Sequence, residues 1–164
     1  MEKEDLELRS RSIQFNNKPI IFRAYGLEND NIKLVRNLFT KMNSEKGLEE
    51  LHKGDKSFES PKNYRLVAEC EDEFLATITL KQDAEFTKNS IVNMYAVVTR
   101  EDYQGSGISS IFFDFACSWA KEMRGTKIKL SVKKNNPRAI RFYEKMNCLQ
   151  VGALENEFVY EKEL

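Results

Sequence analysis

Histidine, cysteine and long apolar runs are scarce in this chain, and each scarcity excludes a class of function. The one histidine, His52, stands in a polar stretch, so a metal centre or a Ser-His-Asp triad would have to depend on it, and we expect neither. The three cysteines, Cys70, Cys117 and Cys148, are odd in number and lack Cys-x-x-Cys spacing. We therefore expect reduced core cysteines and no metal cofactor.

An excess of charge of one sign is also missing. The 26 lysines and arginines balance the 26 aspartates and glutamates, which gives no reason to expect a nucleic-acid partner or an acidic membrane. The charged start, residues 1–5, is not followed by the apolar segment of a secretory signal, and no apolar run approaches the length of a membrane span. We expect a cytoplasmic protein with one domain over residues 1–164.

Two strand-like runs begin the fold. Residues 8–15 and 20–25 flank the segment 16–19, whose Asn-Asn-Lys-Pro sequence is typical of a hairpin turn. Residues 1–19 are therefore expected to form an N-terminal extension that supplies one strand of a hairpin.

The next segment is expected to be helical and then irregular. Asn29 or Asp30 can cap a helix that Gly47 interrupts. A shorter helix is expected near residues 48–53. The polar stretch 54–63, which contains a proline, is expected to be a loop.

The middle of the chain predicts a sheet. Strands at 64–70 and 74–81 join through a tight polar turn as an antiparallel hairpin. One face of the second strand is expected to be the drier one, and it carries Phe74, Ala76, Ile78 and Leu80. After a polar loop at 82–89, residues 91–98 are apolar on both faces, which predicts a central strand.

A glycine-rich turn joins this central strand to a long helix. The helix places one apolar face on the core, formed by Ile108, Ile111, Phe112, Phe115, Ala116, Trp119, Ala120 and Met123. Gly105 and Gly107 let the backbone approach a ligand, and the first amides of a helix that begins near Gly107 have no partners within the helix. The turn is therefore expected to bind the phosphates of a nucleotide-like ligand.

The commoner phosphate ligands do not fit this turn. A nucleoside-triphosphate loop needs Lys and then Ser or Thr after its second glycine, where Ile108 and Ser109 stand. A dinucleotide site needs a third glycine, where the chain has Ser110. It also usually needs an acidic residue after the next strand, where Lys133 and Lys134 stand.

Two motifs instead resemble those of the GCN5-related N-acetyltransferase (GNAT) family, which binds acetyl-coenzyme A. Gln104, Gly107 and Ser109 match the Gln-x-x-Gly-x-small pattern of the family's pyrophosphate loop. The segment 136–145 is similar to the family's Asn-x-x-Ala-x-x-x-Tyr-x-Lys pattern. The resemblance extends from about Tyr64 to the C-terminus, whereas the first sixty residues match only in their strand-then-helix layout.

The resemblance implies an α/β (α+β) fold: a mixed, mostly antiparallel central sheet with helices on both faces. One parallel pair would surround the cofactor loop, formed by strand 91–98 and a strand at 127–132. A last helix begun by Asn136 and C-terminal strands around 148–151 and 158–162 would complete it. The implied co-substrate is acetyl-coenzyme A.

The resemblance also implies where the cofactor binds. Backbone groups of Ala96, Val97 and Val98 would pair with the pantetheine arm and polarise the thioester carbonyl. The pyrophosphate would lie against Gln104, Gly105, Ser106, Gly107, Ile108 and Ser109. Gln104 stands where the family more often has Arg, which gives up a charge-assisted contact. Ser109 adds a hydroxyl that can donate a hydrogen bond to a phosphate.

The last helix would contribute Asn136, Ala139 and Tyr143 to the site. Tyr143 is the candidate general acid, because a phenol with a pKa of about 10 stays protonated when a thiolate with a pKa of about 8.5 departs. The alternative is a core tyrosine on the helix face that carries Ala139 and Met146. Asn136 can be a helix cap, a contact to the pantetheine or thiol region, or both. Lys145 is expected to be a solvated helix residue.

No general base is evident from the sequence. The central strand offers only Asn93 and Tyr95 as polar residues. Glu69, Glu85 or a water relay remain open. Lys133 and Lys134 could lie near the adenosine phosphate or simply at the surface.

The implied function is direct transfer of the acetyl group from acetyl-coenzyme A to a primary amine of a small molecule or a protein. Asp83 and Glu85 could make the acceptor side acidic. A non-catalytic sensor of coenzyme A or an acyl thioester is the alternative, and a dinucleotide-dependent oxidoreductase is a third interpretation. The N-terminal hairpin could line the acceptor pocket or form a homodimer interface.

Overall fold

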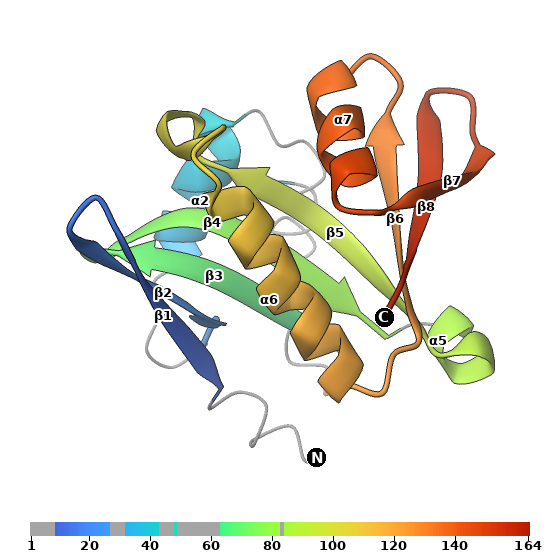
Figure 1. Cartoon of the computed structure of the whole chain (residues 1–164), viewed down its shortest axis with the longest axis horizontal. Helices are drawn as coiled ribbons and strands as arrows, with labels where there is room; N and C mark the ends of the chain where they lie inside the picture. Colours follow the sequence, from blue (N-terminus) through green and yellow to red (C-terminus); the bar gives the residue numbers. More distant parts are fainter. Residues whose placement is uncertain (1–8, 27–31, 43–47, 49–62, 83) are drawn as a thin grey trace.

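The computed structural model describes residues 9–26, 32–42, 48, 63–82 and 84–164 (Figure 1). Its elements are β1 (Ser10–Phe15), β2 (Lys18–Ala24), α2 (Ile32–Lys41), β3 (Asn63–Cys70), β4 (Glu73–Lys81), α5 (Ala84–Asn89), β5 (Ile91–Thr99), η1 (Glu101–Tyr103), α6 (Ile108–Glu122), β6 (Lys127–Lys133), α7 (Pro137–Lys145), β7 (Leu149–Ala153) and β8 (Glu157–Glu163). Within these ranges, no helix combines the length and apolar character needed to cross a bilayer.

The strands form one sheet in the order β1-β2-β3-β4-β5-β6-β8-β7. Every neighbouring pair is antiparallel except β5 and β6, which run parallel. Helices α6 and α7 share the larger buried cluster on one face, and α2 packs in a second cluster on the other (Figure 1). The predicted fold class is confirmed.

The N-terminal hairpin has the predicted pairing and a shorter turn. Asn16 and Asn17 both have positive φ, 49° and 62°, and Phe15 pairs with Lys18 across them. A two-residue turn of this hand matches the twist of the flanking strands, and asparagine tolerates it well. Lys18 and Pro19, predicted to lie in the turn, therefore already belong to β2.

Strand β4 differs from its predicted pattern at Phe74. This ring packs in the α2 cluster, whereas Ala76 belongs to the α6 cluster. A register shift between β3 and β4 leaves Leu75 without a partner and reverses the alternation. The predicted wetter face is also dry: Thr77 is fully buried and donates a hydrogen bond to the Leu66 carbonyl at 2.9 Å.

The predicted polar loop at 82–89 contains a short helix, α5. Phe86 packs against the main core and anchors it. Ser90, at φ 57°, ends the helix and donates its amide to the Phe86 carbonyl at 2.9 Å. One apolar anchor in six residues is too little for a periodic pattern, which is why the sequence suggested a loop.

Helix α6 has a wider buried face than predicted. Phe113 is fully buried, whereas Ile111, assigned to the core face, is 38% exposed. The ring of Phe113 contacts Phe142 and Tyr143 of α7, with centroids 5.8 Å and 6.1 Å away. The helix therefore packs against both the sheet and α7.

The cysteines are all free thiols, as predicted. Cys70 and Cys148 are buried and Cys117 is half-buried.

Several predicted features lie outside the described residues. These are the helix cap at Asn29 or Asp30, the interruption at Gly47, Asp83, and residues 49–62, which include His52.

Candidate active site

A gap in the sheet lies between β5 and β6. The two strands pair only through Ile91–Asn93 and Lys127–Lys129, and they diverge beyond these residues. Helix α7, which follows β6, lies beside the gap (Figure 1). The C-terminal half of β5 therefore has a neighbouring strand on the β4 side only.

A bulge in β5 coincides with this gap. Thr77 pairs with Val98 and Thr79 with Tyr95, so Ala96 and Val97 have no register partner on β4. Ala96 has a φ of 49°, which is uncommon for a residue with a Cβ and turns the backbone locally. Of the three residues predicted to face the thioester, Ala96 and Val97 thus lack a register partner on β4, whereas Val98 has one.

The loop after β5 presents the start of α6 to the same region. Gly105 and Gly107 have φ values of 74° and 92°. Gly107 is the N-cap of α6 and has no side chain to satisfy the first amides. Among the residues that the structure describes, only the Ile108 amide of this first turn finds a side-chain acceptor, the Ser106 hydroxyl at 3.4 Å. A helix start of this kind favours an anion.

Three polar side chains hold the loop in place. Ser106 donates to the Tyr103 carbonyl, and Ser109 donates to the Thr99 hydroxyl at 3.0 Å. Gln104 donates its amide to the Thr99 carbonyl at 2.9 Å. In this structure the Ser109 hydroxyl, predicted to face a phosphate, is therefore bonded to the end of β5.

Helix α7 brings the second motif to the gap. Asn136 caps it by accepting the Ala139 amide at 3.1 Å, and Pro137 takes the first helical position. Seven residues later, Tyr143 is 7% exposed and packs against Phe113 and Phe142. The cap fixes the start of the helix and thereby the direction of the tyrosine.

The Tyr143 hydroxyl has no hydrogen-bond partner among the described residues. Burial raises the pKa of this phenol well above its ordinary value. Tyr143 is consequently protonated throughout the neutral range.

Two cavities meet at Tyr143. One, of about 580 Å³, lies between the loop, α6 and α7, and we call it the loop-side cavity. The other, of about 500 Å³, lies between β5, β6 and the β7–β8 hairpin, and we call it the hairpin-side cavity. Val97, Val98, Asn136, Ala139 and Tyr143 line both.

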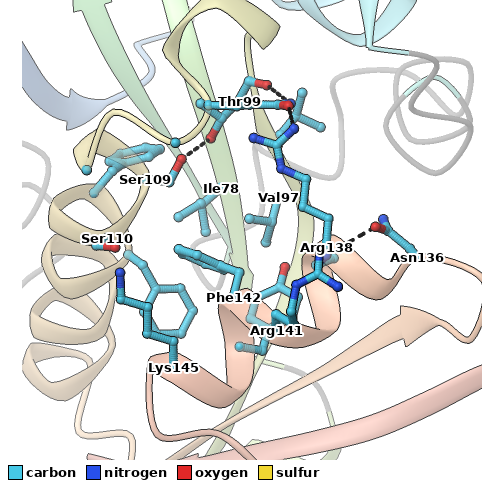
Figure 2. Close-up of a pocket in the computed structure, with 18 of the residues that line it drawn as sticks. Ile78, Val97, Thr99, Ser109, Ser110, Asn136, Arg138, Arg141, Phe142 and Lys145 are labelled. Carbon is cyan, nitrogen blue, oxygen red and sulfur yellow. Dashed lines mark hydrogen bonds between the residues drawn. The ribbon is translucent and has the colours of Figure 1, made fainter.

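The charges of the two cavities differ. The described lining of the loop-side cavity contains Arg138, Arg141 and Lys145 and no carboxylate. Figure 2 shows these side chains projecting from α7. The hairpin-side cavity is lined by Lys129, Lys133 and one described carboxylate, Glu157.

Glu69, one of the two carboxylates considered from the sequence, does not line either cavity. Glu69 pairs with Arg23 at 2.9 Å on β3 and β2. Glu85 belongs to α5, which comes directly before the start of β5, whereas the bulge of β5 lies toward the end of that strand. Glu157 was not among the predicted site residues, because it lies in the short strand β8 and no local motif includes it.

The lysine that ends β6 and the lysine that follows it do not line the cavity at the glycine-rich loop. Lys133 lines the hairpin-side cavity, and the Lys134 ammonium lies over the Phe158 ring at 5.3 Å. Neither lines the loop-side cavity. The described residues contain no group of three or more His, Cys, Asp or Glu side chains suited to a metal ion.

The sequence of residues 32–147 matches the model of the Acetyltransferase (GNAT) family. The chain belongs to the GNAT family. No curated protein is similar enough in sequence to count as a relative.

Solved structures of GNAT acetyltransferases share the fold. The PaiA N-acetyltransferase from Thermoplasma acidophilum, in complex with coenzyme A, has a TM-score of 0.72 and 16% identity, covering 88% of this chain and 99% of that one. The GNAT domain of S. lividans PAT has a TM-score of 0.76 and 14% identity, covering 94% and 97%. Ribosomal-protein-S5-alanine acetyltransferase from Vibrio fischeri has a TM-score of 0.71 and 13% identity, covering 93% and 96%.

Proposed function

We propose that this GNAT protein transfers the acetyl group of acetyl-coenzyme A to a primary amine. The observation that carries the proposal is the junction of two cavities at Tyr143: one is cationic and begins at the α6 amides, and the other contains a carboxylate. A phosphate-bearing thioester fits the first cavity, and Glu157, which lines the second together with Lys129 and Lys133, offers an incoming amine a proton acceptor.

The loop-side cavity suits the phosphates and pantetheine of acetyl-coenzyme A. The uncapped start of α6 and the cations of α7 would hold the phosphates. The unpaired backbone of Ala96 and Val97 would bind the pantetheine arm as a partial strand and donate to the thioester oxygen. When bound, acetyl-coenzyme A supplies the activated acyl carbon.

Tyr143 and Glu157 would handle the protons. The amine nitrogen bonds to the acyl carbon, the carbon–sulfur bond breaks, and Tyr143 donates its proton to the departing thiolate. Glu157, directly or through water, would take the first proton that the acceptor ammonium must lose. The second proton, which the nitrogen loses as the amide forms, would pass through water and return Tyr143 to its protonated form. The products are an acetamide and a free thiol, and no covalent intermediate on the protein is needed.

The experiment is a thiol-release assay with acetyl-coenzyme A and a panel of primary amines, spanning small metabolites, antibiotics and peptides with free amino groups. We expect at least one amine to accelerate release, with the acetamide detected by mass spectrometry. Tight coenzyme A binding without amine-dependent release would instead support a sensor of acyl thioesters. Stabilisation of the fold by NADPH but not by coenzyme A would support the oxidoreductase.

A further inference from the structure

Three cations form one stripe on α7. Arg138, Arg141 and Lys145 are three and four residues apart, so they project from one side of the helix, and all three line the loop-side cavity (Figure 2). Within the described residues, Arg141 and Lys145 form no ion pair. A cationic stripe without a carboxylate is suited to a polyanion.

Arg138 differs from the other two because it contacts the phosphate loop directly. Its guanidinium donates to the side-chain oxygen of Gln104, and the amide group of the same glutamine is held by the Thr99 carbonyl at 2.9 Å. Figure 2 shows Arg138 extending from α7 toward Thr99. The glutamine thus orients the guanidinium at the loop that begins α6.

The bond between Arg138 and Gln104 joins a charge to a neutral acceptor. A guanidinium binds a phosphate group more strongly, through two parallel charge-assisted hydrogen bonds. With five N–H donors, it can retain Gln104 while it binds an anion at the α6 amides. Lys145, about 10 Å farther along the helix axis, is not placed to do the same at this loop.

We propose that Arg138 binds the diphosphate of the thioester co-substrate and that Gln104 positions it. Arg138 then supplies from α7 the guanidinium that the loop itself lacks at position 104. This inference rests on the proposed function, because it concerns the phosphates of coenzyme A. It makes Arg138 a determinant of affinity for thioesters that carry a diphosphate.

The test is calorimetric titration of the full-length protein with coenzyme A and with 3′-dephospho-coenzyme A, which retains the diphosphate. Arg138→Ala should lower the affinity for both ligands by the same factor, about tenfold to a hundredfold, which is the range for one charge-assisted contact. Arg138→Lys should recover part of the loss, because it restores the charge without the fork. Arg36→Ala, an exposed arginine on α2 outside both cavities, is the matched control and should change neither affinity.

Three results would overturn the assignment. Loss of affinity for coenzyme A alone would mean that Arg138 binds the 3′-phosphate. Unchanged affinity for both ligands would remove Arg138 from the site. If ligand-free Arg138→Ala and Arg138→Lys melt at lower temperatures than the wild type, and their losses of ligand affinity follow these decreases, the role of Arg138 is structural. If the wild-type protein binds neither ligand, the proposed function fails as well.

Discussion

The ring of Tyr143 lies 6.1 Å from that of Phe113, and this contact joins the two helices that bound the loop-side cavity. Tyr143 packs through its ring, whereas its hydroxyl has no hydrogen-bond partner among the described residues. Removing the hydroxyl therefore separates a catalytic role from a packing role.

Tyr143→Phe should lower amine-dependent thiol release by about a hundredfold to ten-thousandfold, the range for losing a general acid. Its melting temperature and coenzyme A affinity should remain close to wild type, because the ring contacts are kept. Tyr160→Phe is the control: this buried tyrosine bonds Glu144 at 3.3 Å and lines neither cavity, so it should retain the wild-type rate. An unchanged rate in Tyr143→Phe would refute the general-acid role.

Glu157→Gln should lower kcat/KM for the amine at neutral pH by about a hundredfold, because the ammonium loses its proton acceptor. The loss should shrink as the pH approaches the pKa of the amine, where the neutral nucleophile is already present. Glu161→Gln, on the same strand but outside both cavities, should behave like wild type. A defect that is independent of pH would indicate a structural role for Glu157.

Asn136→Ala should destabilise the fold by about 0.5–2 kcal/mol, because the cap bond to the Ala139 amide is lost. Asn136→Asp keeps an acceptor at the cap and should retain stability. Urea denaturation measures both. If Asn136 also faces the ligand, Asn136→Asp should remain stable but bind coenzyme A more weakly than the wild type. Equal affinity of the variant and the wild type for coenzyme A would mean that Asn136 is only a helix cap.

Gly125→Ala should destabilise the protein by about 1–3 kcal/mol through overpacking. A Cβ at this position would lie 2.6 Å from Val92 Cγ2 and 2.9 Å from the Ala120 carbonyl oxygen. Gly152→Ala is the control, since its Cβ would meet only Val159, at 3.9 Å. Thermal unfolding of the two variants should therefore differ, and equal melting temperatures would contradict the packing at Gly125.

Alkaline pH should destabilise the fold through two thiols. Burial raises the pKa of Cys117 to about 12 and that of Cys148 to about 11. The unfolded chain loses these protons near pH 8.5, so stability is intact below that pH and falls as the pH rises toward the folded values. In urea denaturation at a series of pH values, Cys117→Ala should reduce the decrease of the unfolding free energy with pH by at most about 1.4 kcal/mol per pH unit. Identical slopes would show that Cys117 does not contribute.

Local sequence signals predicted the elements around the proposed site well. Helix α6, the Asn136-Pro137 start of α7 and the doubly apolar β5 all lie where the pattern indicated, although the buried face of α6 differs at Ile111 and Phe113. Each depends on a feature encoded within a few neighbouring residues.

Features that depend on long-range packing were not predictable. Phe74 lies on the face of β4 opposite to the predicted one because of a bulge. Phe113 is buried because α7 packs on α6. Arg138 and Glu157 reach the cavities only because β6, α7 and β8 surround the gap. No short motif marks such residues, since their roles arise from residues distant in sequence.

The short pairing between β5 and β6 has a kinetic consequence. Residues 129–133 of β6 line the hairpin-side cavity, whereas Arg138, Arg141 and Lys145 of α7 line the loop-side cavity. The two cavities therefore reach Tyr143 past different elements. For the proposed reaction, both reactants can be bound at once in a ternary complex, and initial-rate plots should intersect rather than run parallel. A bisubstrate molecule that links coenzyme A to the acceptor through the gap should then compete with both.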